Sequence, residues 1–200
     1  MNHDIFFFPD VETTGVKSDA VVLEVGWAIT DSNFEYLVPP KSHIVEHGDN
    51  WGMVWDALKN APKVVRDMHD ESGLKGEMLA HRARPFQAIA AEIEDDLSMA
   101  AAHFGRLDPV AVTMTGMSVE FDRNFLFRSD LRWQADEDHL QLGWYFHHSL
   151  LNLSSLRIAW ELAGSPSISV NNPRPHRAKN DVAEGVELAK AYINDLKGIK

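Results

Sequence analysis

Five residues of this chain have types and positions that could do chemistry together. They are four carboxylates and one histidine: Asp10, Glu12, Asp122, Asp181 and His176. Asp10 and Glu12 follow an apolar run and are two positions apart, so an extended chain points both side chains the same way. Asp122 and Asp181 lie near the starts of predicted helices, where α/β proteins place ligands. We therefore expect the five groups to meet in one cleft.

Four carboxylates in one cleft repel each other unless cations neutralise them. Oxygen ligands favour hard ions, so the expected cofactors are two divalent cations, Mg²⁺ or Mn²⁺. Two such ions can hold the attacking water and the leaving oxygen during phosphodiester hydrolysis. A histidine is the natural general base, because an imidazole's ordinary pKa lies near neutral pH. Taken singly, each acid is better explained as an ordinary turn, strand-end or helix-start residue, and His176 as an exposed loop histidine.

The elements that must position these residues predict an α/β fold, a mixed β-sheet flanked by α-helices. Apolar and β-branched runs predict strands at residues 5–8, 20–30, 34–38 and 110–115. The first would end at Pro9, which cannot donate to a sheet, and residues 10–15 would form a turn. Short turns join the first three strands, which predicts an antiparallel meander.

Apolar residues at three-and-four spacing predict helices in the rest of the chain. These helices cover residues 63–69, 74–82, 85–97, 120–130, 154–162 and 178–196. Ser154 or Ser155 is the expected N-cap of the fifth. Serine, asparagine and three prolines collect at 165–177 without periodicity, so a loop is expected there.

Size and composition fit one folded domain spanning residues 1–200, with 44% hydrophobic residues. The formal charge of −11 argues against a protein that grips long nucleic acids, so a nucleic-acid ligand should be short or held through metal ions. The chain has no cysteine, which excludes disulfides and thiolate zinc sites. No apolar run is long enough to span a bilayer, and the N-terminus lacks a signal peptide's basic segment, so we expect a cytoplasmic protein without membrane contact.

Three segments resemble the ordered motifs of the DEDDh exonuclease superfamily. They read FPDVETTG at 8–15, GMSVEFDRNFLF at 116–127 and HRAKNDVAEG at 176–185. The resemblance implies a ribonuclease-H-like fold, two divalent cations and 3′-to-5′ hydrolysis. By motif position it makes His176 the base and assigns the metal to four carboxylates: Asp10, Glu12, Asp122 and Asp181.

Within that superfamily, nearly the whole chain resembles oligoribonuclease. The resemblance is carried by LEVGWAITDSNFEYL at 23–37, MHDESGL at 68–74, WYFHH at 144–148 and LSSL at 153–156. It implies hydrolysis of short single-stranded RNA, with short DNA as a further substrate, to nucleoside 5′-monophosphates. It also implies a homodimer, for which the aromatic run 144–146 is a plausible contact, although these rings could equally fill the monomer core. The implied substrate contacts are Thr13, Gly15, Val16, His69 and Ser118.

Several positions depart from the oligoribonuclease pattern. His148 and Ser149 stand where the family carries a Tyr-Arg pair, and Val64 replaces a tryptophan. Thr13 replaces the usual methionine, which brings the first motif closer to general superfamily members. Because an arginine fork binds a terminal 5′ phosphate strongly, its loss predicts weak restriction of substrate length.

Other interpretations stay open at this point. A broader exonuclease that trims 3′ ends of RNA or DNA, and a catalytically silent nucleotide-binding module, both fit the same fold. Three cations near the predicted base, Arg174, Arg177 and Lys179, could contact phosphate or could be solvated charges.

Overall fold

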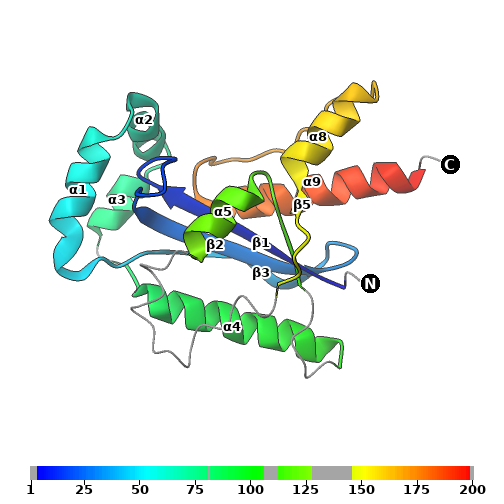
Figure 1. Ribbon diagram of the computed structural model, residues 1–200, viewed down its shortest axis with the longest axis horizontal. Coiled ribbons are helices and arrows are strands. Elements are labelled where there is room, and N and C mark those ends of the chain that lie inside the picture. The colour runs from blue at the N-terminus through cyan, green and yellow to red at the C-terminus, as the bar shows by residue number, and fades with distance from the viewer. Residues whose placement is uncertain (1–3, 81, 106–111, 128–145, 199–200) are drawn as a thin grey trace.

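The computed structural model describes residues 4–80, 82–105, 112–127 and 146–198 (Figure 1). Its centre is a five-stranded sheet in the order β3-β2-β1-β4-β5. The strands are β1 (Ile5–Thr13), β2 (Val22–Asp31), β3 (Tyr36–Ile44), β4 (Thr113–Gly116) and β5 (Leu151–Asn152). β1, β2 and β3 pair antiparallel, whereas β4 runs parallel to both β1 and β5. The predicted mixed sheet and antiparallel meander are thus confirmed.

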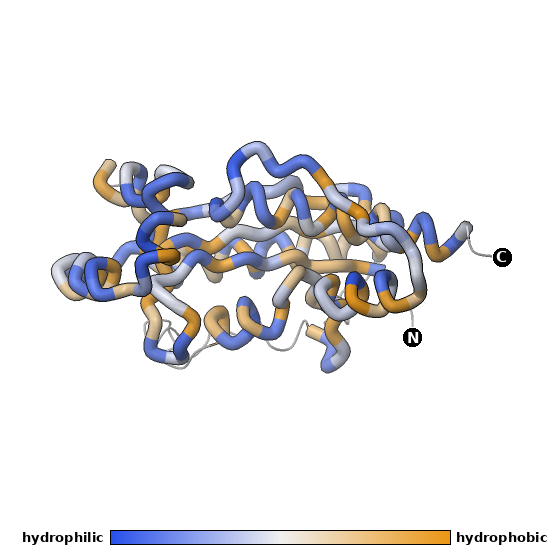
Figure 2. The backbone as a smooth tube through the Cα atoms, turned by 90° about the horizontal axis from the view of Figure 1, so that it is seen from above, coloured by the Kyte–Doolittle hydropathy of each residue, from blue (hydrophilic) through white to orange (hydrophobic). Residues whose placement is uncertain are grey.

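Helices flank this sheet, as predicted. They are η1 (Gly48–Asn50), α1 (Trp51–Asn60), α2 (Lys63–Glu71), α3 (Leu74–Leu79), α4 (Phe86–His103), α5 (Val119–Leu126), α8 (Leu153–Leu162) and α9 (Ala178–Gly198). In Figure 1, α4 lies along one side of the sheet and α9 along the other, while α1, α2 and α3 gather beside the arrowhead of β1. Figure 2 shows hydrophobic and hydrophilic residues alternating along the outer helices, as expected of elements with one buried face. Among the described residues, no helix has the length and apolarity that crossing a membrane requires.

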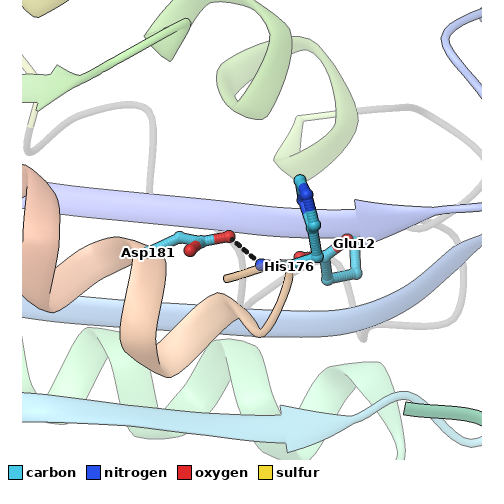
Figure 3. A group of neighbouring side chains, drawn as sticks. All are labelled: Glu12, His176 and Asp181. Atoms are coloured by element: carbon cyan, nitrogen blue, oxygen red, sulfur yellow. Dashed lines mark hydrogen bonds between the residues drawn. The ribbon is translucent and has the colours of Figure 1, made fainter. Parts of the chain in front are cut away.

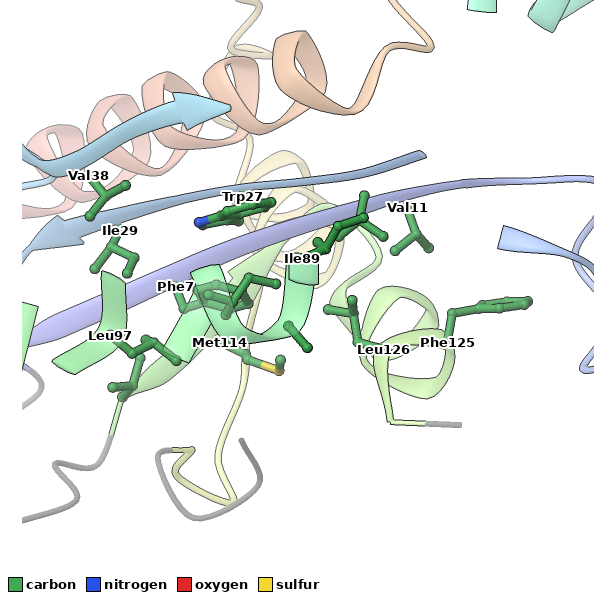
Figure 4. Close-up of a cluster of buried hydrophobic side chains, with 14 of the residues drawn as sticks. Phe7, Val11, Trp27, Ile29, Val38, Ile89, Leu97, Met114, Phe125 and Leu126 are labelled. Carbon is green, nitrogen blue, oxygen red and sulfur yellow. The ribbon is translucent and has the colours of Figure 1, made fainter. Parts of the chain in front are cut away.

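The side chains of β1 alternate between two cores. Ile5, Phe7 and Val11 pack into the cluster beneath α4, where Figure 4 shows Phe7 and Val11 beside residues of α4 and α5. Phe6 and Phe8 point to the opposite face and pack against α8 and α9. Because successive side chains of a strand face opposite ways, every even-numbered residue of β1 lies on the α9 face. Asp10 and Glu12 belong to that set.

The prediction that β1 ends at Pro9 was wrong, since the strand continues to Thr13 and pairs with β2 throughout. Val11 donates its N–H to Asp122 Oδ1 at 3.0 Å, on the side of β1 away from β2. Residues two apart in a strand direct their N–H groups the same way. The missing N–H of Pro9 therefore removes no hydrogen bond to β2, and residues 10–13 extend the strand instead of turning.

β3 also runs further than predicted, through Pro39 and Pro40. It is an edge strand, and its register with β2 shifts where these two prolines stand opposite Ala28. Proline is tolerated at edge strands and bulges because fewer ladder bonds are needed there.

The helix predictions were largely right, with two corrections. α1 was missed, and burial of Val54 and Leu58 is what holds it in place. Asn152, rather than Ser154 or Ser155, caps α8, because its side chain accepts the N–H of Ser155 at 2.9 Å. The predicted loop at 165–177 contains no helix or strand. Residues 110–111 of the fourth predicted strand, the end of the 120–130 helix, and Trp144 and Tyr145 lie outside the described residues.

Candidate active site

Asp10 and Glu12 continue the α9 face of β1 beyond the apolar pair Phe6 and Phe8. Glu12 is only 6% exposed. Asp10 Oδ2 is buried, and no described residue is within hydrogen-bonding reach of it. Buried carboxylate oxygens nearly always have a partner, so this atom marks a place where a ligand is expected.

α5 adds Asp122 to the end of β1. The short connection from β4 to α5 puts Asp122 in the first turn of the helix, where it is 6% exposed. Its hydrogen bond from the N–H of Val11 fixes the carboxylate against β1. A helix start also favours a negative charge, so the backbone supports an acid at this position.

α9 begins unusually close to β2, and its first turn carries Asp181 into the site. A Cβ at Gly26 would lie 2.7 Å from the main-chain carbonyl carbon of Ala178, so only glycine permits this approach. Asp181 Oδ2 accepts the main-chain N–H of His176 at 3.0 Å, and its Oδ1 accepts the Asn172 amide at 2.6 Å. Figure 3 shows that the imidazole of His176 points away from the Asp181 carboxylate, so the main chain rather than the ring holds this contact.

The predicted chemical groups line one cavity of about 460 Å³. Its walls come from β1, the β4–α5 connection, α9 and the segment just before α9. One ligand atom from each of Glu12, His176 and Asp181 lies within 4.8 Å of the other two, which is compatible with a shared metal ion. The cavity therefore brings together all five residues singled out from the sequence: Asp10, Glu12, Asp122, His176 and Asp181.

Burial and mutual repulsion raise the pKa of these carboxyl groups. Burial raises the pKa of Glu12 to about 8, with a further contribution from the nearby Asp181. Burial likewise raises the pKa of Asp122 to about 7. The pKa of Asp10 is raised well above its ordinary value by burial, and the negative charge of Asp122 adds to the effect. Burial also raises the pKa of Asp181. The cavity is thus short of positive charge.

These observations fit divalent cations. An orphaned carboxylate oxygen, clustered ligand atoms and raised carboxyl pKa values are what a site built for cations presents without them. The donors are mostly carboxylate oxygens, which suit hard ions such as Mg²⁺ or Mn²⁺. Asp10, Glu12, Asp122 and Asp181 are the residues that would hold them.

Comparison with known proteins gives the family. No family model matches the chain. The chain is 30% identical to the oligoribonuclease of Rhodococcus jostii over 191 residues, which cover 92% of this chain and 83% of that protein. It is 29% identical to the oligoribonuclease of Streptomyces avermitilis over 196 residues, covering 95% and 86%. The chain belongs to the oligoribonuclease family.

Solved structures share the fold of this oligoribonuclease relative. A zinc-bound complex of E. coli exonuclease I with single-stranded DNA matches 99% of the chain with a TM-score of 0.65 and 15% identity. A complex of the same enzyme with a dT13 oligonucleotide matches 98% with a TM-score of 0.62 and 14% identity. The chain spans less than half of exonuclease I, 42% and 43% in these two structures. The likeness confirms the predicted ribonuclease-H-like α/β fold.

The residues expected to contact an oligoribonuclease substrate lie at different depths. Ser118 lines the cavity. His69 is fully buried, and its Nε2 lies 2.8 Å from the carbonyl oxygen of Thr13. Its Nδ1 is 3.8 Å from Glu12 and lacks a hydrogen-bond partner in the described chain. The Thr13 hydroxyl donates to the carbonyl of Gly15, and Val16 is 82% exposed. Of this set, Ser118 is the member that reaches the cavity wall.

Sequence reasoning missed the groups that surround the predicted ones. Arg177 is neither a solvated charge nor free to contact phosphate, because it is buried and bound to Glu24 and Glu77. Asn172 binds both Asp181 and Glu184, a further acid that lines the cavity. One signal was available: a glutamate in the middle of an apolar strand, as in LEVGW, needs a buried partner of opposite charge.

Proposed function

We propose that this protein is a metal-dependent 3′-to-5′ exonuclease that hydrolyses short single-stranded RNA to nucleoside 5′-monophosphates. The observation that carries the proposal is the convergence of four carboxylates and one histidine in a single cavity of an oligoribonuclease family member. A catalytically silent module of the same fold has no chemical need for four clustered acids that repel one another.

The chain's own residues divide the chemistry between them. Asp10, Glu12, Asp122 and Asp181 hold the cations, which when bound neutralise the phosphodiester charge and favour ionisation of water. His176 accepts the proton of the attacking water on an imidazole nitrogen. The His176 ring is exposed, whereas its main chain is fixed to Asp181, so it can meet a substrate entering from solvent.

A cleavage ladder tests this proposal. A 5′-labelled RNA of about seven nucleotides is incubated with Mn²⁺, and we expect labelled products that shorten one nucleotide at a time from the 3′ end. Excess EDTA should abolish the ladder. Binding of the RNA without any ladder, in the presence of Mn²⁺ or Mg²⁺, would favour the silent module instead.

A broader exonuclease that trims RNA or DNA 3′ ends is the second candidate. Val64 and Ser149, which replace a tryptophan and an arginine of the oligoribonuclease pattern, favour it. Val64 is 71% exposed on α2 and Ser149 is exposed before β5, so neither closes a pocket within the monomer. RNA and DNA ladders of graded length, run side by side, separate the two candidates.

We also propose a homodimer, on the strength of the oligoribonuclease resemblance. Phe146 of the aromatic run packs against Phe7 and Phe127 in the monomer, which supports a core role for that ring. Sedimentation at micromolar concentration tests the assembly, and a monomer alone would remove it. A cytoplasmic location stays a prediction from the sequence.

A further inference from the structure

The segment that carries His176 is fastened at two points to the α2–α3 pair. Arg174 and Arg177 flank the histidine, and both reach Glu77 on α3. Neither arginine is among the cavity-lining residues. Glu77 lies about a hundred positions before the two arginines in the chain. Its contacts with them are therefore tertiary contacts rather than local ones.

Arg177 makes the stronger of the two contacts. Its Nε and Nη2 each lie 3.0 Å from a different oxygen of Glu24, and its Nη1 and Nη2 lie 2.6 and 2.5 Å from the two oxygens of Glu77. Both pairs are bidentate, the geometry in which arginine binds carboxylates most tightly. Glu24 also accepts the N–H of Ala178 at 3.2 Å, so the same acid caps the start of α9.

Arg174, on the other side of His176 in the chain, makes the second set of contacts with the α2–α3 pair. Its Nε donates to the carbonyl of Ser72 at 2.8 Å, and its Nη1 lies 3.5 Å from Glu77. The guanidinium rests on Gly73, where a Cβ would come within 2.5 Å of Nη2. Gly73 has a φ of +72°, which already favours glycine. The turn between α2 and α3 is therefore shaped to receive Arg174.

Between the two arginines, His176 has a backbone conformation that needs support. Its φ of +62° is in the left-handed region, which is uncommon for residues with a Cβ. Such conformations are unfavourable and persist where the surroundings impose them. At His176 these surroundings are the hydrogen bond that its main-chain N–H donates to Asp181 and the contacts of the arginines on each side.

We infer that Glu77 is a positioning residue, which holds Arg174 and Arg177 so that His176 stands over the carboxylates. This inference rests on the proposed function for its effect on turnover. Removing the Glu77 charge leaves Arg177 bound to Glu24 alone and Arg174 bound to the Ser72 carbonyl alone, so both fastenings of the segment are weakened. A displacement of about 1 Å at a reacting group can cost on the order of 100-fold in rate.

A double-mutant cycle tests the inference. Glu77→Gln keeps the shape and removes the charge, and we expect kcat to fall about 10- to 100-fold with KM nearly unchanged. In a His176→Ala background the same change should cost less than about two-fold, because contacts that act through one residue are not additive. Glu77→Asp, which keeps the charge, should recover part of the rate. The control is Glu187→Gln, the same change at an exposed position of α9.

A second measurement does not depend on turnover. Hydrogen exchange of peptides covering residues 165–177 should be faster in Glu77→Gln than in wild type or Glu187→Gln, while peptides of β1 stay protected. Equal rate losses in both backgrounds, a pure rise in KM, or unchanged exchange would each overturn the inference. An inactive wild-type protein whose exchange responds as expected would instead count against the proposed function alone.

Discussion

Two groups of charged residues lie on opposite faces of the same sheet and have opposite electrostatics. The ionic network joins β3 to α4 and consists of Lys41, His43, Arg84, Glu92 and Asp96; the carboxylate cavity on the α9 face holds Asp10, Glu12, Asp122, Asp181 and His176. In the network, burial alone would raise the pKa of Glu92, but hydrogen bonds from Lys41 and Arg84 lower it to about 2. In the cavity, burial raises the pKa of Glu12 to about 8.

The difference lies in where the positive charge comes from. Lys41 Nζ is 2.9 Å from Glu92 and 2.7 Å from Asp96, and the indole of Trp27 donates to Asp96 as well. The network is therefore neutralised by the chain itself and stabilises the fold. The two arginines that flank His176 are bound to Glu77 and Glu24 and are not among the residues that line the cavity, so they do not neutralise its acids. Buried acids with built-in partners are structural, and buried acids without them indicate a ligand site.

Neutralising one acid in the cavity and one in the ionic network should give the largest difference in activity and stability. Asp10→Asn should abolish turnover, because the remaining carboxylates are too weakly charged to hold two cations, yet it should leave the unfolding free energy in EDTA unchanged or higher. Glu92→Gln should keep its activity and lose about 1–3 kcal/mol of stability, since Arg84 loses its carboxylate partner and Lys41 keeps only Asp96. Initial rates with Mn²⁺ and urea denaturation in EDTA measure both effects. Activity of Asp10→Asn within ten-fold of wild type would break the comparison.

Replacing His176 in the cavity should have the second-largest effect on activity. A positioned general base contributes roughly 10²–10⁴-fold, so His176→Ala should lose activity in that range while Mn²⁺ still raises the melting temperature. The acidic limb of the pH–rate profile should also change, because an imidazole must be neutral to accept a proton. If the variant keeps the wild-type pH profile, another group is the base.

The two groups should also respond differently to pH. In the metal-free protein the raised carboxyl pKa values mean that the folded state binds protons more tightly than the unfolded chain. Stability then falls as pH rises from about 4.5, the ordinary value for glutamate, through about 8, the folded pKa of Glu12. Glu92 has a depressed pKa, so its stabilising contribution is already complete above about 4.5 and does not vary over this window.

Thermal unfolding in EDTA between pH 5 and pH 8 measures this response. We expect a decrease of about 1 kcal/mol or more, roughly 2–4 °C for a chain of this length. Saturating Mg²⁺ should flatten the curve, and Glu12→Gln should flatten it in part without metal, because Asp122 keeps its raised pKa. A melting temperature that rises steadily with pH in EDTA would contradict the assigned burial of these carboxyl groups.

The preference for short substrates should show the smallest effect. It tests the part of the comparison that concerns positively charged side chains. Arg174 and Arg177 are held by Glu77 and Glu24, so they cannot replace the phosphate-binding arginine for which this chain has Ser149. Ser149→Arg should increase the preference for dinucleotides over pentanucleotides by roughly ten-fold, the value of one charge-assisted contact. The ratio of kcat/KM values on 5′-phosphorylated RNAs decides this. A wild-type protein that already falls steeply between two and three nucleotides would show the prediction to be wrong.

The sequence by itself predicted what depends on local spacing. Asp10 and Glu12 two apart in an extended segment, Asp122 and Asp181 at helix starts, and the apolar stripe of α4 all follow from the periods of strands and helices. The order of three motifs was sufficient to indicate the DEDDh exonuclease superfamily, and further segments such as 23–37 and 68–74 indicated oligoribonuclease within it. The spacings could be predicted because each depends on residues within a few positions of one another.

Tertiary structure decided what depends on partners distant in the chain. Pro9 can remain inside β1 only because its absent N–H faces away from β2, and α1 is held by the core rather than by a cap. Arg177 looked like a surface cation beside the predicted base, but Glu24 lies 153 positions earlier in the chain and binds it in the interior. Local sequence carries no record of such a pairing, because its free energy arises only when folding excludes water from both charges at once.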